Sequence, residues 1–387
     1  MDKNIQKYFF ILLFPIILVL PLPLQFSTVS LVLLCINLIT LSTKEELTTN
    51  GQKIFQNKLI ILLAGVFFLD LVIMLIVEGR LKFVYKEVRL AFILLPPIIF
   101  LTKNKLAKIR DLVLLSTVFG ILIYIAYADI YLIYFYNQVA NVEFALDHFL
   151  KYNYTNIPGA YHHSYQGLYM LFSIMILLDN SITSKKIRKE VSRFLVAIIF
   201  VHMIFMAGKL TLMLALIFIA LSALKPYFWK SKLKLWAVGA SIVLMTVMVI
   251  FLNMNKLFDT IAFSFSNRIN SWTCSMRLFF ENPILGTDEA TIMKSLNACV
   301  ESNAISTHNQ YLNELLDYGI FALWLPVFYF LIFLRSKNNG LLRNLLYMII
   351  ILSLFENVFS LQRGVLFIIF YFSLLYFCPL KNNIQLE

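Results

Sequence analysis

The chain has 387 residues, of which 60% are hydrophobic and 14% are charged, and its formal net charge is +12. So many apolar residues exceed what a water-soluble core can bury, which excludes a soluble globular domain and predicts an all-α helical bundle in a membrane. Lys and Arg beside membrane spans, together with membrane lipids as partners, account for the positive charge, so nucleic acid is not expected as a partner.

Windowed apolarity predicts about 12 transmembrane helices within a single membrane domain, residues 1–387. Lys and Arg gather in alternate connections between these spans, which predicts an even number of spans and both termini in the cytoplasm. The expected spans are 8–23, 26–42, 58–77, 87–101, 111–135, 162–179, 194–208, 210–224, 234–252, 319–334, 342–358 and 364–379.

Two long external connections follow from this topology, residues 136–163 and 253–318, and long loops on a rigid bundle usually carry function. The second contains "SFSNRINSWTCSMRLFFENPILG", which predicts an amphipathic helix that lies at the membrane interface and ends at Pro283 and Gly286. Its apolar residues at helical spacing are Ile269, Trp272, Met276 and Phe279.

A second, shorter helix is expected in "ISTHNQYLNELLDYGI". Thr307 and Gln310 have capping-box spacing, so we expect Thr307 to be the N-cap, His308 the first helical residue and Gly319 the C-terminal end. A helix N-terminus favours an anion and disfavours a protonated imidazole. His308 would therefore tend to stay neutral, as a base or a hydrogen-bond donor must. The alternative is a loop histidine that only caps its own helix.

Two cations stand out at the external side. Lys209 lies between two apolar spans, and ionisable residues at membrane depth are usually functional, although a lysine in a simple external hairpin is the alternative. Arg268 lies in the predicted interfacial helix, where an arginine that only grips lipid phosphate is the alternative.

Three further histidines have simpler interpretations. His162 and His163 begin the sixth span just before Tyr165, where interfacial anchoring is the alternative to function. A zinc site needs a third ligand at a suitable spacing, so no metal is expected. His202 lies alone on an apolar span, where a packed histidine is expected.

The four cysteines fall into two pairs. Cys35 and Cys378 lie in predicted spans and are expected to be inert. Cys274 and Cys299 lie in the larger external connection, which is an oxidising environment if it faces the periplasm. We therefore predict a disulfide between Cys274 and Cys299.

The external motifs resemble those of a known superfamily. "NRINSWTCSMRLFFENPILGT" followed by "STHNQYLNELLDYGIFAL" resembles the Arg, Trp, Asn-Pro-Leu-x-Gly and His-Asn-x-Tyr-Leu signature of the O-antigen ligases and polymerases. "YHHSYQGLYM" and "ENVFSLQRGVLFIIFYFSLL" are similar to the external helix start and closing span of its Bacteroidetes-type members. The Lys209 turn is similar to its Ser-Arg element, with lysine in place of arginine.

The resemblance implies an O-antigen ligase-like inverting glycosyltransferase of lipopolysaccharide biosynthesis, on the periplasmic face of a bacterial inner membrane. Its donor would be an undecaprenyl-pyrophosphate-linked glycan and its acceptor a hydroxyl of the lipid A core, with no cofactor. A polysaccharide polymerase that joins lipid-linked repeats is the nearest alternative, and a transporter or flippase is the non-enzyme alternative.

Matched residue by residue, the resemblance implies that Arg268 and Lys209 bind the donor pyrophosphate and that His308 is catalytic. A wider set of residues is expected on the acceptor side or in support of the site: His162, His163, Tyr165, Asn309, Tyr311 and Arg363.

Overall fold

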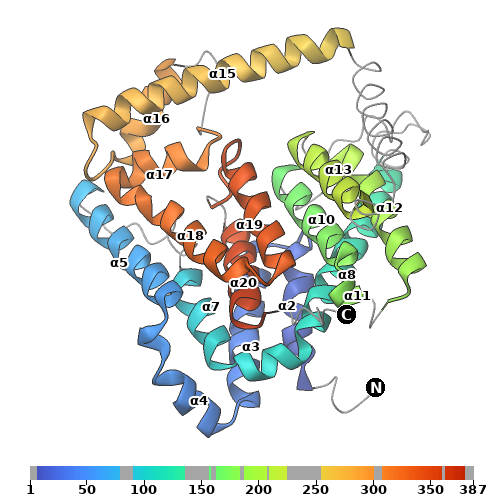
Figure 1. The fold of residues 1–387 in the computed structure, drawn as a ribbon. Helices are drawn as coiled ribbons and strands as arrows, with labels where there is room; N and C mark the ends of the chain where they lie inside the picture. The colour runs from blue at the N-terminus through green and yellow to red at the C-terminus, as the bar shows by residue number, and fades with distance from the viewer. Residues whose placement is uncertain are drawn as a thin grey trace.

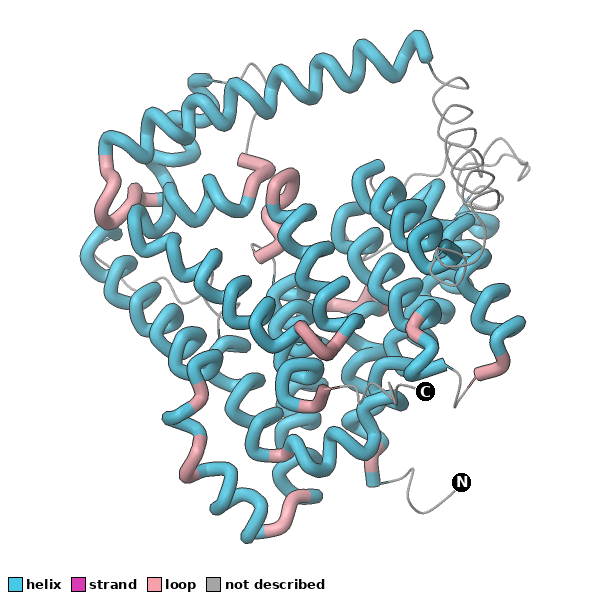
Figure 2. The backbone as a smooth tube through the Cα atoms, in the orientation of Figure 1, coloured by secondary structure: helices cyan, strands magenta, loops and turns pink. Residues whose placement is uncertain are grey.

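The computed structural model describes residues 7–78, 90–135, 157, 163–183, 187–206, 209–224, 254–299, 307–359 and 362–379. Within these residues the chain consists of helices joined by loops, with no strand, which confirms the predicted all-α class (Figure 2). In chain order the helices, with η marking 3₁₀ turns, are α2 (Phe9–Val19), α3 (Leu24–Leu41), α4 (Lys44–Gly51), η1 (Ile54–Gln56), α5 (Lys58–Glu78), α7 (Leu90–Leu101), α8 (Lys103–Tyr134), α10 (His163–Leu178), α11 (Asn180–Thr183), α12 (Lys189–Met206), α13 (Lys209–Leu224), α15 (Met254–Glu281), α16 (Glu289–Cys299), α17 (Gln310–Tyr318), η5 (Gly319–Leu323), α18 (Trp324–Ser336), α19 (Gly340–Ser353) and α20 (Gln362–Phe377).

The helix lengths support a multi-pass membrane protein without confirming 12 spans. Among the described residues, three stretches are long and apolar enough to cross a bilayer: Lys58–Val77, Lys103–Tyr134 and Gln310–Ser336. A fourth is a pair of helices, Gln25–Leu41 and Lys44–Gln56, bent by 107°. Other apolar helices have 10–17 residues, fewer than the roughly 20 that span a bilayer core. The expected span 234–252 lies outside the described residues, as does most of the expected loop 136–163.

Helices α10 and α20 form the centre of the bundle. Every residue of α10 from Ser164 to Leu177 is buried, as is every residue of α20 from Gly364 to Leu375. The rings of Phe172 and Tyr371 join the two helices, with centroids 4.6 Å apart. Large apolar side chains elsewhere remain exposed on single helix faces, as at Phe68 of α5, which is 60% exposed. Such faces are what a lipid-embedded bundle presents to its solvent.

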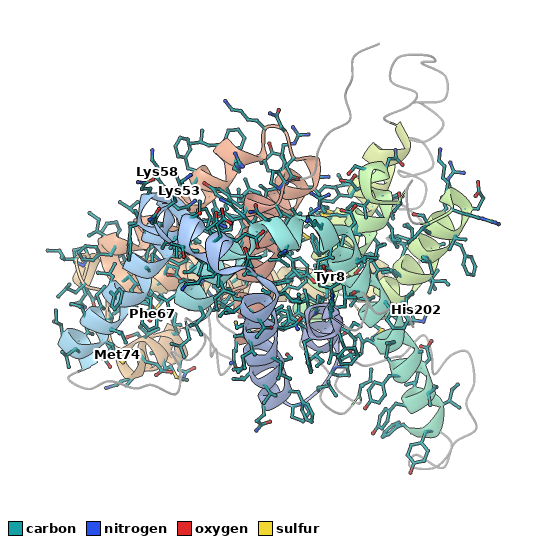
Figure 3. The ribbon with its side chains drawn as sticks, turned by 90° about the horizontal axis from the view of Figure 1, so that it is seen from below. Tyr8, Lys53, Lys58, Phe67, Met74 and His202 are labelled. Atoms are coloured by element: carbon teal, nitrogen blue, oxygen red, sulfur yellow. A yellow bond between two sulfur atoms is a disulfide. The ribbon has the colours of Figure 1, made fainter. Side chains whose placement is uncertain are left out.

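The polar connections gather at two opposite ends (Figure 1). At the lower end, the Asn50 side-chain amide of α4 donates to the Leu101 carbonyl at 2.8 Å, and that of Asn339 donates to the Leu375 carbonyl at 3.1 Å. Lys53 and Lys58 lie at the start of α5, with Phe67 and Met74 farther along it (Figure 3). Among the described residues, the connection from α4 to α5, which the Lys and Arg pattern assigns to the cytoplasm, therefore lies at the end away from α15, α16 and α17 (Figure 1).

The predicted interfacial helix is present as α15, which crosses the upper end of the bundle (Figure 1). It begins before the expected segment and ends at Glu281, just ahead of Pro283. Cys274 and Leu278 pack against α16 and α17, together with Phe279 of the predicted apolar stripe, while Ile269 of that stripe is 44% exposed. Among its described residues, the expected external connection thus contains one long helix and two short ones, where the sequence predicted one amphipathic helix and one shorter helix.

His202 is half-buried in α12, as expected of a packed histidine, and it has a partner in another helix. Its Nε2 atom lies 3.0 Å from Oδ2 of Asp129 in α8, and its Nδ1 atom lies 2.9 Å from the Ile198 carbonyl oxygen. Because the acidic partner comes from another helix, no local pattern around His202 indicates it. Isolated polar groups at membrane depth are costly. The contacts with Asp129 and Ile198 give both ring nitrogens a partner within this apolar helix.

Cys274 of α15 and Cys299 at the end of α16 are joined as a disulfide, with their Cα atoms 6.2 Å apart. For the protein in its membrane, we expect Cys274→Ser to abolish a mobility difference between reduced and non-reduced samples on a denaturing gel. We also expect it to lower the free energy of unfolding, by about 3 kcal/mol in the chain-entropy view of such loops. Alkylation of both native thiols in isolated membranes without reductant would contradict the bond.

Candidate active site

Helix α17 begins later than the sequence predicts. Its N-cap is Asn309, whose Oδ1 accepts a hydrogen bond from the Leu312 N–H at 3.1 Å, so Gln310 is the first helical residue. Thr307 is therefore not the N-cap, and its hydroxyl instead accepts the Asn309 N–H at 3.2 Å. His308 has a φ of 48°, a left-handed conformation that cannot continue into a helix. Both the capping prediction and the helical placement of His308 are wrong.

His308 faces a carboxylate that the sequence analysis missed. Its Nδ1 atom lies 3.7 Å from Oε2 of Glu356, and the two side chains are 48% and 16% exposed. A carboxylate beside Nδ1 favours the tautomer with the proton on that nitrogen, which leaves Nε2 to accept a proton. Distances slightly beyond hydrogen-bond range are common in catalytic pairs that tighten when substrate binds. Two sequence signals could have indicated Glu356: it follows the apolar helix α19, and it begins the stretch "ENVFSLQRGVLFIIFYFSLL" that carries part of the family resemblance.

Arg268 of α15 reaches the same carboxylate. Its Nη2 atom lies 3.7 Å from Oε1 of Glu356, while its Nη1 donates to the Phe355 carbonyl oxygen at 2.8 Å. Three segments remote in sequence therefore meet here: α15, the loop before α17, and the segment after α19. The structure thus brings together two of the three residues expected to carry the chemistry, Arg268 and His308.

Glu356 is ionised at neutral pH. Burial acts to raise its pKa, but the polar contact and charge of His308 and the charge of Arg268 outweigh burial and hold the pKa below its ordinary value of 4.5. The cluster therefore has a fixed negative charge between an arginine and an imidazole. That charge can stabilise an imidazolium when His308 accepts a proton.

Several of the expected supporting residues hold the segment after α19 in place. Asn309 Nδ2 donates to the Leu354 carbonyl at 3.1 Å, and the Tyr165 hydroxyl donates to the Asn357 carbonyl at 2.7 Å. The Tyr311 hydroxyl lies 3.4 Å from the Ile350 carbonyl, at the end of α19. Asn309 and Tyr165 thus bind the backbone on either side of Glu356, and these contacts position the carboxylate.

A buried polar chain extends this support into the bundle. Gln310 Oε1 accepts the Phe359 N–H at 2.8 Å, and its Nε2 donates to Glu314 at 2.8 Å. The fully buried Glu314 also accepts the Trp324 indole N–H at 2.7 Å. On the other side, the Trp272 indole N–H of α15 donates to the Thr307 carbonyl at 2.9 Å, beside His308.

The ends of α15 and α17 are fastened by two backbone hydrogen bonds, which we call the glycine clasp. The Ile320 N–H donates to the Pro283 carbonyl at 2.8 Å, and the Thr287 N–H donates to the Leu316 carbonyl at 2.7 Å. Gly286 and Gly319 lie inside the clasp with φ of 81° and 55°. Gly319 is the C-cap of α17, which confirms the predicted end of that helix.

One family model matches part of the chain. Residues 195–327 match the family model described as O-antigen ligase. This match covers about a third of the chain and supports an O-antigen ligase-like superfamily member. The stretch matched to this family includes Arg268, the glycine clasp and His308, whereas Glu356 lies beyond it. No curated protein matches the chain.

Other residues expected from the O-antigen ligase resemblance remain predictions. Lys209 is the first residue of α13 and Arg363 lies in α20, but their side chains, like the whole of His162, lie outside the described residues. His163 is half-buried as the first residue of α10, two positions before Tyr165.

Proposed function

We propose that this protein is an inverting glycosyltransferase that moves a glycan from undecaprenyl pyrophosphate to a hydroxyl of the lipid A core. The observation that carries the proposal is the meeting of Arg268 and His308 at Glu356, within a chain that matches O-antigen ligase. Pyrophosphate is already a good leaving group. The reaction therefore needs mainly a base for the acceptor hydroxyl and cations where charge develops.

In the proposed reaction, the acceptor oxygen bonds to the anomeric carbon as the bond from that carbon to the pyrophosphate oxygen breaks. His308 Nε2 takes the acceptor proton while Glu356 holds the Nδ1 proton and balances the new positive charge. Arg268 stabilises the departing pyrophosphate through its guanidinium N–H groups, with Lys209 as a second cation. A single displacement of this kind inverts the anomeric configuration and needs no covalent enzyme intermediate.

We place the reaction on the periplasmic face of a bacterial inner membrane, with both termini in the cytoplasm. Two observations support this orientation. Lys and Arg concentrate in the connections predicted to be cytoplasmic, and α15 to α17 lie at the opposite end from α4 (Figure 1).

The test is the lipopolysaccharide ladder of a deletion strain that expresses variants of the chain. We expect His308→Ala and Arg268→Ala to abolish glycan attachment and to leave lipid-linked glycan outside. Arg277→Ala should retain attachment, because Arg277 is an exposed cation on the same helix α15 and is not part of the cluster. Retained attachment in His308→Ala would refute the proposed role.

The same ladder separates the alternative activities. Long polymer that accumulates unattached in the deletion strain indicates a ligase, whereas single repeats attached to the core indicate a polymerase. Absence of lipid-linked glycan from the external face in that strain would indicate a transporter or flippase, and the proposed transferase activity would then be wrong.

A further inference from the structure

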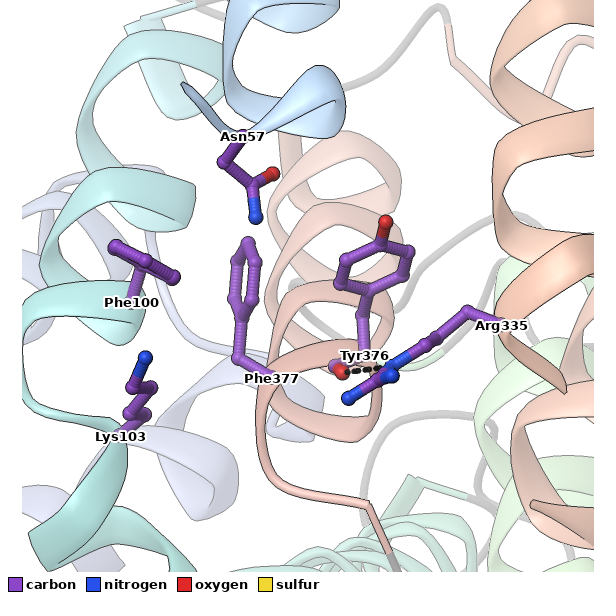
Figure 4. A pocket seen from close by; sticks show the side chains of 6 residues that line it. All are labelled: Asn57, Phe100, Lys103, Arg335, Tyr376 and Phe377. Atoms are coloured by element: carbon purple, nitrogen blue, oxygen red, sulfur yellow. Dashed lines mark hydrogen bonds between the residues drawn. The ribbon is translucent and has the colours of Figure 1, made fainter. Parts of the chain in front are cut away.

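A second polar pocket lies at the end of the bundle away from His308. It has a volume of about 250 Å³ and is lined by six residues: Asn57, Phe100, Lys103, Arg335, Tyr376 and Phe377 (Figure 4). These residues come from the start of α5, the end of α7, the start of α8 and the ends of α18 and α20. The pocket therefore lies where five helices converge at the predicted cytoplasmic side.

The pocket has uncompensated positive charge. Two neighbouring cations have acidic partners, since Lys105 lies 3.8 Å from Glu46 and Arg110 lies 2.7 Å from Asp111. In the part of the chain that the structure describes, Lys103 and Arg335 have no acidic partner within 4 Å, and their like charges repel each other across the pocket. An anion between these cations would relieve that repulsion.

Lys103 and Arg335 also have N–H groups that can donate hydrogen bonds to an anion. Arg335 uses its Nε for the Tyr376 carbonyl at 3.3 Å, and among the described residues no oxygen accepts from its Nη atoms. Lys103 Nζ lies 4.2 Å from the centroid of the Phe100 ring, a cation–π contact that leaves its N–H groups for an anion. Asn57 Oδ1 accepts the Leu59 N–H at 3.1 Å, so its amide nitrogen points into the pocket (Figure 4).

The walls of the pocket suit a lipid. The rings of Phe100, Tyr376 and Phe377 border the cations, so a charged group and an apolar chain could be held side by side (Figure 4). The pocket lies at the ends of apolar helices, the depth at which lipid headgroups lie. We propose that it binds the phosphodiester of an anionic phospholipid, with Lys103 and Arg335 on the phosphate, and thereby joins α18 to α7, α8 and α20.

The experiment uses the full chain purified in a neutral detergent. Lipid binding is followed by native mass spectrometry, and thermal unfolding is measured with added dioleoylphosphatidylglycerol, dioleoylphosphatidylcholine or inorganic phosphate. We expect phosphatidylglycerol to be retained and to raise the unfolding temperature, with no comparable effect of the other two. The variant Lys103→Gln/Arg335→Gln should bind phosphatidylglycerol about tenfold more weakly or worse.

The matched control is Lys108→Gln/Arg343→Gln, which removes the same charge from two exposed positions at the same end and should bind like wild type. If the double pocket variant does not fold, Arg335→Gln alone should show a smaller loss, since Arg335 is exposed at the end of α18. Equal binding by pocket and control variants, or equal stabilisation by phosphatidylcholine, would overturn the proposal. Full stabilisation by inorganic phosphate alone would overturn the assignment to a lipid.

Discussion

We expect Glu356→Gln to lower the rate of the proposed glycan transfer by roughly 10²-fold, the range expected when a group that orients a catalytic base loses its charge. The substitution keeps the size of the side chain but removes the charge that faces His308 Nδ1 and Arg268. The imidazole then has no negative partner as it becomes positive. The measurement is single-turnover transfer by purified protein with a lipid-linked donor. Glu281→Gln, which changes an exposed acid at the end of α15, is the control that should keep the wild-type rate.

The double variant His308→Ala/Glu356→Gln decides whether Glu356 acts through His308. If it does, adding Glu356→Gln to His308→Ala costs little more, because the group that the carboxylate orients is already absent. A further large loss would mean that Glu356 acts mainly through Arg268. A wild-type rate in the single Glu356→Gln variant would remove the carboxylate from the mechanism altogether.

The pH dependence of stability gives a second readout of the same residue. The pKa of Glu356 is lower in the folded chain than its ordinary value of 4.5, so the unfolded chain binds the proton first as pH falls. The stabilisation is complete above pH 4.5 and is lost as pH falls through the folded-state pKa. We therefore expect the unfolding temperature of wild type to fall more steeply than that of Glu356→Gln below pH 4.5. If the unfolding temperatures of wild type and Glu356→Gln fall in parallel as pH is lowered, the contact of Glu356 with His308 and Arg268 is contradicted.

How far the site could be predicted depends on whether each feature is local. The helix α15 and the end of α17 at Gly319 were predictable because spacing and glycine act within a few residues. The start of α17 was not, because Thr307 and Asn309 both suit a cap, and contacts from other segments decide between them. Glu356 was missed for the same reason, since only packing brings the end of α19 beside His308.

The membrane topology shows a similar limit. Apolar runs located most of the helices, but they did not predict that α2 and α7 would have only 11 and 12 residues. Hydropathy measures how apolar a segment is, whereas helix ends are fixed by caps, prolines and packing. The pairing of His202 with Asp129 likewise depends on which helices are neighbours, which no single-helix pattern contains.

The largest loss of stability is expected for Gly319→Ala, in the glycine clasp. A Cβ at this position would lie 2.5 Å from the backbone C and O atoms of Ile284, and the φ of 55° already disfavours any side chain. Left-handed strain and overpacking together should cost about 3 kcal/mol or more. The measurement is thermal unfolding of the purified protein in detergent. Gly286→Ala should behave alike, because its Cβ would lie 2.5 Å from the Leu316 carbonyl oxygen.

Two other glycines distinguish the clasp from a general effect of adding a methyl group. Gly65 in α5 and Gly340 in α19 have nothing within 4 Å of an added Cβ, so alanine there should leave stability unchanged or raise it by up to about 1 kcal/mol. If Gly319→Ala unfolds at the wild-type temperature while these controls behave as expected, backbone rearrangement relieves the clash. The clasp would then not be what holds α15 against α17, and the placement of Arg268 beside His308 would depend instead on the Trp272 contact with Thr307.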